Sequence, residues 1–170
     1  MKKEYASLIL YNYRRISEFR IEFTTQSDVL YLVTFLDASD YFGMHPEFSH
    51  KVKSFQFEVK RNPHAVLPPD PRVGATISYL ILQFFEQNEE GVLFFVHEKS
   101  DGKDKSRFRK FESWLRRSGN KTLVKHDAEI SVGRTSILLS ILLSKDHPQI
   151  EEIVGGFDQL VLESSEKPDD

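Results

Sequence analysis

Cationic side chains are concentrated in one segment of a chain that is acidic overall. The chain has 170 residues and a formal net charge of −3, yet residues 99–125 contain ten basic and three acidic residues, a net charge of +7. The remaining residues contribute 13 basic and 23 acidic side chains, a net charge of −10. Widening the window to residues 97–129 lowers the local excess to +4, so the asymmetry persists in weaker form. Clustered lysines and arginines attract carboxylates and phosphates, which makes this segment the first candidate for an anion site.

The loop at the start of this segment has the features of a phosphate-binding turn. It leads from a predicted strand to a predicted helix, and Gly102 permits a tight turn there. Unpaired backbone N–H groups and the helix dipole favour an anion at a helix start. In the alternative interpretation, Asp101 or Asp104 caps the helix and the lysines keep the loop soluble. Both interpretations stay open; the lysines of the loop are Lys99, Lys103 and Lys105.

Arg107 differs from the other cations of the predicted helix, which spans about residues 104–117. At about 100° per residue, Arg107 falls between Phe111 and Trp114, on the margin of the apolar face. Four other cations of the helix point to solvent or lie on a flank; they are Arg109, Lys110, Arg116 and Arg117. We predict that Arg107 pairs with an acid or with backbone carbonyls and braces the loop. In the functional alternative, it faces a cleft and meets the anion of a ligand.

The histidines do not form a metal-binding or catalytic motif. No pair has the spacing of a zinc protease, and the P-loop, GxGxxG and GxSxG patterns are missing. One set of residues would converge only if the strands that carry them were neighbours: His97, Glu98, His126, Asp127 and Glu129. The chain has no cysteine, which excludes a disulfide scaffold, a cysteine nucleophile and a thiolate metal site. The sequence therefore predicts no cofactor and no metal.

The first sixty residues have the composition and alternation expected of strands. Residues 19–23 and 29–36, separated by turn formers, predict an antiparallel hairpin, and residues 54–60 predict a third strand. The last of these strands alternates strictly and would point Phe55, Phe57 and Val59 inward. The first ten residues have too short an apolar run for a secretory signal and are predicted as a strand. The stretch from residue 37 to residue 51 is predicted as a long loop.

A proline-rich connector over residues 61–71 leads to a second half that contains helices and strands. Asp70 as N-cap and Pro71 at the first helical position predict a helix, and Gly91 fits its end. Later elements are a strand covered on both faces (92–97), the basic helix, strands at 122–130 and 136–144, and a short last helix at 146–157. Residues expected in the core include Ile81, Phe84, Phe111 and Trp114.

The order of these elements predicts a single α+β domain over residues 1–162. It would consist of a strand-rich part (1–60), the connector (61–71) and a helix and strand half (72–162). The sheet would be mostly antiparallel, with about three helices packed on it. Residues 163–170 are polar and acidic and are predicted to form a disordered tail.

A recognisable motif lies within the basic segment. An apolar strand is followed by the loop SDGK and then by a helix with the spacing RxxxFxxW; the residues are Ser100, Asp101, Gly102, Arg107, Phe111 and Trp114. This order resembles a bacterial family catalogued only as a domain of unknown function. Lys103 stands where that family has Arg, and Leu115 where it has Phe. DPRV and KDHPQIEEIVGGF are also similar, so the resemblance covers most of the chain. It implies no activity, but it draws attention to the loop and to Arg107.

These patterns favour a non-enzymatic binding or adaptor domain that meets an anionic ligand or an acidic partner through residues 99–121. The expected ligand-binding residues are Lys99, Asp101, Gly102, Lys103, Lys105, Arg107 and Trp114. Nucleic-acid binding is expected to be weak and non-specific. No apolar run approaches the ~20 residues of a membrane span, so we expect a soluble, cytoplasmic protein. The alternative is a small enzyme that acts on a phosphate-containing substrate at residues 97–107. The oligomeric state is left open.

Overall fold

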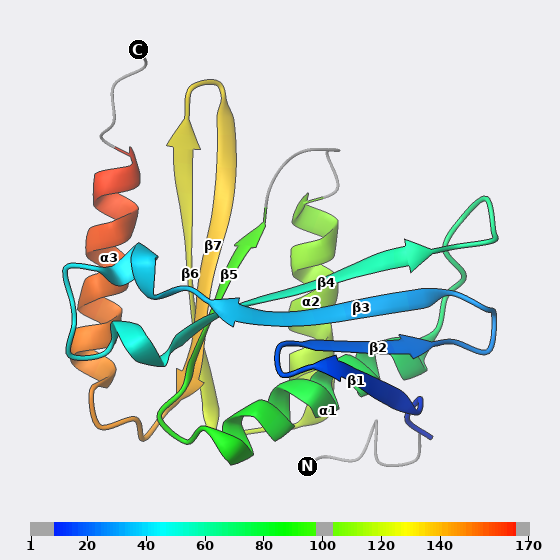
Figure 1. Cartoon of the computed structure of the whole chain (residues 1–170). Coiled ribbons are helices and arrows are strands. Elements are labelled where there is room, and N and C mark those ends of the chain that lie inside the picture. The colour runs from blue at the N-terminus through cyan, green and yellow to red at the C-terminus, as the bar shows by residue number, and fades with distance from the viewer. Residues whose placement is uncertain (1–8, 98–103, 166–170) are drawn as a thin grey trace.

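The strands of the protein form one mixed sheet. The structure, a computed structural model, describes residues 9–97 and 104–165, and for residues 104–108 it describes the backbone alone (Figure 1). Within these residues, seven strands pair in the order β1-β2-β3-β4-β5-β7-β6. The strands are β1 (Tyr13–Ser17), β2 (Arg20–Thr24), β3 (Leu30–Asp37), β4 (Val52–Arg61), β5 (Val92–His97), β6 (Leu123–Val132) and β7 (Thr135–Ser144).

All neighbouring strands run antiparallel except β4 and β5, which are parallel. Three α-helices and two short 3₁₀ helices complete the described chain: α1 (Pro71–Gln87), α2 (Asp104–Ser118), α3 (Ile150–Ser165), η1 (Ser39–Phe42) and η2 (Ser49–Lys51). This arrangement confirms the predicted α+β class, with a mostly antiparallel sheet and three helices. None of the described helices has the length and apolar character needed to cross a membrane.

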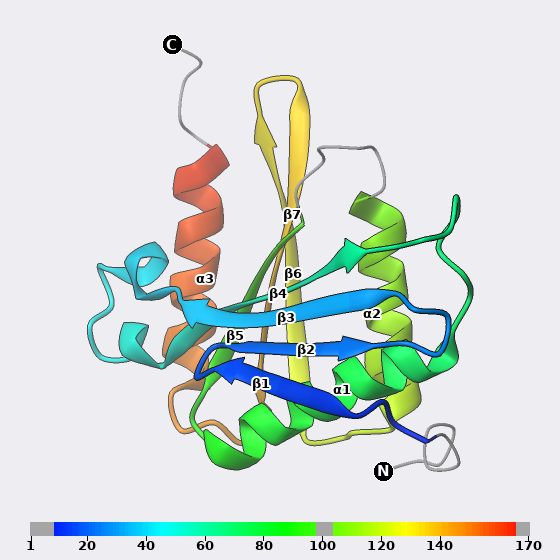
Figure 2. The same ribbon diagram turned by 45° about the vertical axis from the view of Figure 1, so that its right-hand side comes forward.

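The helices cover opposite faces of the sheet, as Figures 1 and 2 show. Alternate residues of the central strands face opposite sides, so β5 and β7 contribute to two separate cores. The α1–α2 core includes Phe55, Phe95, Phe111 and Trp114. The α3 core lies on the other side and includes Phe42, Phe48, Phe94 and Phe157. This confirms that residues 92–97 form a strand covered on both faces.

The start of α1 follows the predicted pattern closely. The Asp70 carboxylate accepts a hydrogen bond from the Arg72 N–H at 3.0 Å, and Pro71 is the first helical residue. A cap of this kind satisfies one of the backbone donors that a helix start leaves free. The helix ends close to residues 88–91, as predicted, but its cap is Asn88 and not Gly91, because α1 stops at Gln87. Gly91 instead lies in the turn that leads into β5, where its N–H donates to the Asn88 carbonyl.

The boundaries of three other elements differ from the sequence prediction. Residues 9–12 are irregular, and the first described strand begins at Tyr13; the rest of the strand predicted over the first ten residues lies outside the described residues. The predicted loop before β4 contains η1 and η2, because Phe42 and Phe48 turn inward and are buried in the α3 core. The last helix continues to Ser165 instead of ending near residue 157, so it reaches into the residues that were expected to form the tail.

The predicted core residues are largely buried. Phe111 is 1% exposed, Trp114 6% and Ile81 0%. Phe84 is only partly buried and stacks on Phe35 with ring centroids 5.3 Å apart. Val59, predicted to point inward, is 39% exposed because it lies near the far end of β4. The helical projections of α1 and α2 are therefore confirmed for the residues that define their buried faces.

Candidate functional site

Helix α2 is held against the sheet by its aromatic residues. The Phe111 ring lies 4.7 Å from that of Phe95, and the Trp114 ring lies 5.4 Å from that of Phe57. Trp114 also packs against Gly74 of α1, where a Cβ would overlap the indole ring. These contacts fix the rotation of α2 about its axis. Since the aromatic side faces the sheet, the opposite side faces solvent.

The solvent side of α2 is basic. Four of its cations are exposed, and a fifth exposed cation follows in the next turn: Arg109, Lys110, Arg116, Arg117 and Lys121. No ion pair joins any of them to another residue in the part of the chain that the structure describes. The Lys110 Nζ lies 5.4 Å from the centre of the Trp114 ring, within reach of a cation–π attraction. The prediction that four cations of this helix form a solvated surface is confirmed.

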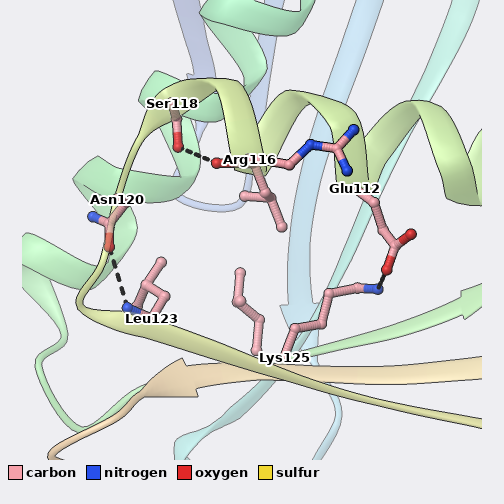
Figure 3. Close-up of a pocket in the computed structure, with 8 residues that line it drawn as sticks. Glu112, Arg116, Ser118, Asn120, Leu123 and Lys125 are labelled. Atoms are coloured by element: carbon pink, nitrogen blue, oxygen red, sulfur yellow. Dashed lines mark hydrogen bonds and ion pairs between the residues drawn. The ribbon is translucent and has the colours of Figure 1, made fainter. Parts of the chain in front are cut away.

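A pocket of about 290 Å³ lies beneath the second half of α2, between this helix and β6 (Figure 3). It is lined by Glu112, Leu115, Arg116, Ser118, Asn120, Leu123, Lys125 and Leu142. The turn that links α2 to β6 beside the pocket is shaped by Asn120, whose side-chain oxygen accepts hydrogen bonds from the N–H groups of Thr122 and Leu123 at 2.7 and 3.1 Å. The pocket thus has an apolar floor and a polar rim.

The two cations of the pocket differ in how much of their charge is neutralised. The Lys125 Nζ lies 3.2 Å from the Glu112 Oε1 and 2.6 Å from the Asp127 Oδ1, and the side chain is only 13% exposed. Asp127 also accepts a hydrogen bond from the buried Ser140 hydroxyl at 2.6 Å. Arg116, by contrast, is exposed and has no acidic partner among the described residues. An anion that enters the pocket would therefore be attracted mainly by Arg116.

The structure describes only part of the site that the sequence predicts. The loop residues Lys99, Asp101, Gly102 and Lys103 lie outside the described residues. Lys105 and Arg107 belong to α2, but their side chains are also outside the described part, so the ion pair proposed for Arg107 stays a prediction. Trp114 is described, and its indole ring forms part of the α1–α2 core with Lys110 above it.

Sequence reasoning missed the pocket itself. Glu112, Asn120 and Lys125 come from a helix, a turn and a strand, and they meet only because β6 runs back beneath α2. The one available signal was the short turn between α2 and the next strand, which favours close packing of the two elements. The pairing of Lys125 with Glu112 could not be read from their separation in sequence.

The described members of the histidine and carboxylate set near the strand ends do not converge, and Glu98 lies outside the described residues. β7 lies between β5 and β6, so His97 and Glu129 are separated by Leu138, with which both are in register. His126 is in register with Ile141 of the α3 core, whereas Asp127 is in register with Ser140, so they lie on opposite faces. In residues 9–97 and 104–165, no group of three or more His, Asp or Glu side chains is placed to hold a metal ion.

Comparison with known proteins gives one match. A protein-family model described as a family of unknown function (DUF6169) matches residues 69–159, which is more than half of the chain. The matched segment begins just before α1 and ends within α3, so it includes α2 and every residue of the pocket. No curated protein and no solved structure matches the chain.

Proposed function

We propose that this chain, which belongs to the family of unknown function DUF6169, is a non-enzymatic binding domain that meets an acidic partner through α2. The observation that carries the proposal is the set of exposed cations on α2 that have no ion-pair partner among the described residues. Exposed cations elsewhere in the described chain are scattered: Arg14 and Arg61 pair with Glu22 and Asp28, and others, such as those in β2 and the β6–β7 turn, lie singly, whereas four gather on α2. The solvent side of α2 is thus available to a partner.

The arrangement of α2 favours binding in two physical ways. A row of unpaired cations attracts an acidic partner from a distance and orients it, which raises the association rate. The aromatic side of the helix is locked against the sheet, so the cations are presented on a rigid element and lose little conformational freedom on binding. Binding therefore requires no rearrangement of the described fold.

The pocket between α2 and β6 supplies an anchoring point for one acidic side chain. The planar guanidinium of Arg116 at its rim can hold a carboxylate through two parallel hydrogen bonds. Leu115, Leu123 and Leu142 would contact the aliphatic stem of that side chain. Lys125 is already paired with two carboxylates, so it contributes to the shape of the pocket more than to its net charge.

An acidic protein surface fits this face better than a nucleic acid does. A nucleic acid needs many phosphate contacts to overcome the repulsion from a chain whose net charge is −3. The described α2 offers four exposed cations and also carries Glu112 beside the pocket. A partner with a few separated carboxylates matches that number, whereas a continuous phosphate backbone would extend toward a chain whose residues outside 99–125 have a net charge of −10.

A titration with a labelled poly-glutamate peptide tests the proposal. Fluorescence anisotropy at low salt should show binding to the natural chain, and the double variant Arg109→Glu/Arg116→Glu should bind about tenfold more weakly. Two exposed ion pairs contribute about 1.4 kcal/mol together, which corresponds to that factor. High salt should abolish binding to both proteins, because exposed charges are screened.

A matched control separates the α2 face from net charge. Arg20→Glu/Arg134→Glu changes the net charge by the same amount at two exposed arginines in β2 and in the β6–β7 turn. This control should bind the peptide almost as well as the natural chain. Equal loss in both double variants would show that only the overall charge matters, and no binding by the natural chain would refute the proposed function.

A further inference from the structure

We propose that the acidic partner of α2 is helix α3 of a second copy of this chain, so that copies associate head to tail. This inference rests on the proposed function, since it names the partner of the same basic face. Helix α2 contains six basic and two acidic residues, a net charge of +4. Helix α3 contains four acidic residues and no basic residue, a net charge of −4. The two helices are thus complementary in sign and equal in magnitude.

A single copy cannot bring these two helices together. Phe111 and Trp114 of α2 belong to the core on one face of the sheet, and Ile153 and Phe157 of α3 belong to the core on the other. Figures 1 and 2 show the two helices on opposite sides of the sheet, running in opposite directions. Their charged sides therefore face away from each other within one molecule, and only another copy can pair them.

The acids of α3 form two rows along its solvent side. At about 100° per residue, Glu151 and Asp158 fall on one flank and Glu152 and Glu163 on the other. All four side chains are exposed. The strip of the α3 surface between the two rows is therefore flanked by carboxylates on both sides. A row of cations that lies along this strip can pair with either row.

The centre of the α3 face is open and partly apolar. Gly155 lies on that strip, and a Cβ built there would meet no atom within 4 Å. Leu162, seven residues further on, lies on the same strip and is 58% exposed. A helix could approach closely at Gly155, where no side chain intervenes. An apolar centre with a charged rim is the usual composition of a protein interface.

The spacing of the arginines on α2 matches this face. Arg109 and Arg116 are seven residues apart, as are Gly155 and Leu162, and two helical turns span about 10.5 Å. When one copy is translated onto the next, α2 lies antiparallel to α3. Arg116 then falls near Gly155 and the acids of the first turn of α3, and Arg109 falls near Leu162. This alignment also places opposite helix dipoles side by side.

The proposed contact is heterologous, because it joins two different surfaces. A linear assembly of any length would keep one unused α2 at one end and one unused α3 at the other, so association would not stop at a dimer. The average mass measured by sedimentation or light scattering should therefore rise continuously with protein concentration. A plateau at twice the mass of one chain would contradict the proposed geometry.

Charge-swapped variants of the full chain test the contact. Arg109→Glu/Arg116→Glu should abolish self-association, and so should Asp158→Lys/Glu163→Lys, whose new lysines lie toward the end of α3 where the dipole favours cations. A one-to-one mixture of the two variants should associate again, because the unaltered α3 of the first meets the unaltered α2 of the second. Circular dichroism checks that each variant is folded, and Arg20→Glu/Arg134→Glu should associate like the natural chain.

The outcomes separate this inference from the proposed function. If the natural chain binds the poly-glutamate peptide but remains a monomer at high concentration and low salt, the second copy is not the partner, and the proposed function stands. If it neither binds the peptide nor associates, both fail. Self-association that persists in the two charge-swapped variants would place the contact elsewhere and overturn the inference. Excess poly-glutamate should dissolve the assemblies if both proposals are correct.

Discussion

On each face of the sheet, an aromatic ring packs against a glycine of a helix, but the two contacts connect different elements. On one face, Gly74 of α1 contacts the Trp114 indole of α2, so the glycine joins two helices. On the other, Gly156 of α3 lies where a Cβ would be 2.7 Å from the Phe48 ring, so it joins a helix to an irregular segment. The first contact determines how α2 presents its cations. The second fixes the loop between β3 and β4 and leaves the solvent side of α3 unaffected.

This difference means that packing and function are linked more closely on the α1–α2 side. Aromatic contacts there extend from Phe55 and Phe95 to Phe111, with ring centroids 6.1 and 4.7 Å from Phe111. A change in this core would rotate or displace the helix that carries the candidate site. A change in the α3 core would alter stability first. The following substitutions test that distinction, beginning with the largest expected effect.

Removal of one buried ring from each core should have the largest effect. Phe111→Ala should lower the free energy of unfolding by about 3–5 kcal/mol, because the ring is 1% exposed. Phe157, equally buried, makes no ring–ring contact among the described residues, so Phe157→Ala should cost about 1 kcal/mol less. Urea denaturation of both variants measures the difference. An unchanged midpoint for Phe111→Ala would contradict the assignment of the buried face of α2.

High pH should destabilise the α1–α2 core through Tyr31. Burial, together with the negative charge of Asp70, raises the pKa of Tyr31 to about 12. Because the unfolded tyrosine has a pKa of about 10, the folded state holds the proton more tightly. Stability is therefore complete below pH 10 and is lost as the pH rises through 12, by roughly 2 kcal/mol.

The replacement Tyr31→Phe isolates this contribution. The variant should lose less stability than the natural chain when urea denaturation is compared between about pH 9 and about pH 12. Absorbance titration of the tyrosines should show one fewer late-titrating group. Identical pH dependence in the two proteins would mean that other groups account for the alkaline loss.

A graded series of glycine substitutions should give the smallest effects and compares the two faces directly. Gly74→Ala should cost about 1–2 kcal/mol, since overpacking against the rigid indole outweighs the gain in helix propensity. Gly156→Ala should cost less, because the Phe48 ring is its only neighbour closer than 3 Å. Gly155→Ala, with open space around the new methyl group, should stabilise the protein by about 0.5–1 kcal/mol.

Peptide binding by the same variants should differ between the two faces of the sheet. Gly74→Ala should also weaken binding of the poly-glutamate peptide, because Trp114 helps to orient α2. Gly156→Ala should leave peptide binding unchanged. Equal effects of the two substitutions on binding would show that the orientation of α2 does not depend on the contact between Gly74 and Trp114.

The parts of the fold that depend on strong local sequence patterns could be predicted from the sequence. The Asp70–Pro71 start of α1 is a short-range capping pattern, and the apolar run of β5 reports burial on both faces regardless of its partners. The end of α3 was not accessible, because Gly155 and Gly156 resemble a helix stop. In the structure Gly156 is needed for contact with Phe48, and the helix continues beyond it.

The candidate site was only partly accessible for a physical reason. Helical periodicity correctly placed Arg109 and Arg116 on the solvent side of α2, since that property depends on one element alone. The pocket depends on the packing of β6 against α2, and the pair between Lys125 and Glu112 arises from that packing. The periodicity of a single helix or strand does not show which other element packs against it, so it could not predict the pocket.

The single parallel pairing in the sheet has a consequence for folding. β1 to β4 form a meander of local hairpins, whereas β5, β7 and β6 form a separate antiparallel group, and three residue pairs from Val52↔Val92 to Ser54↔Phe94 connect them. Local hairpins form quickly, but this junction must close a long loop, which is entropically costly. We therefore expect each group to acquire protection separately in pulsed hydrogen exchange during refolding, with the β4–β5 ladder protected last.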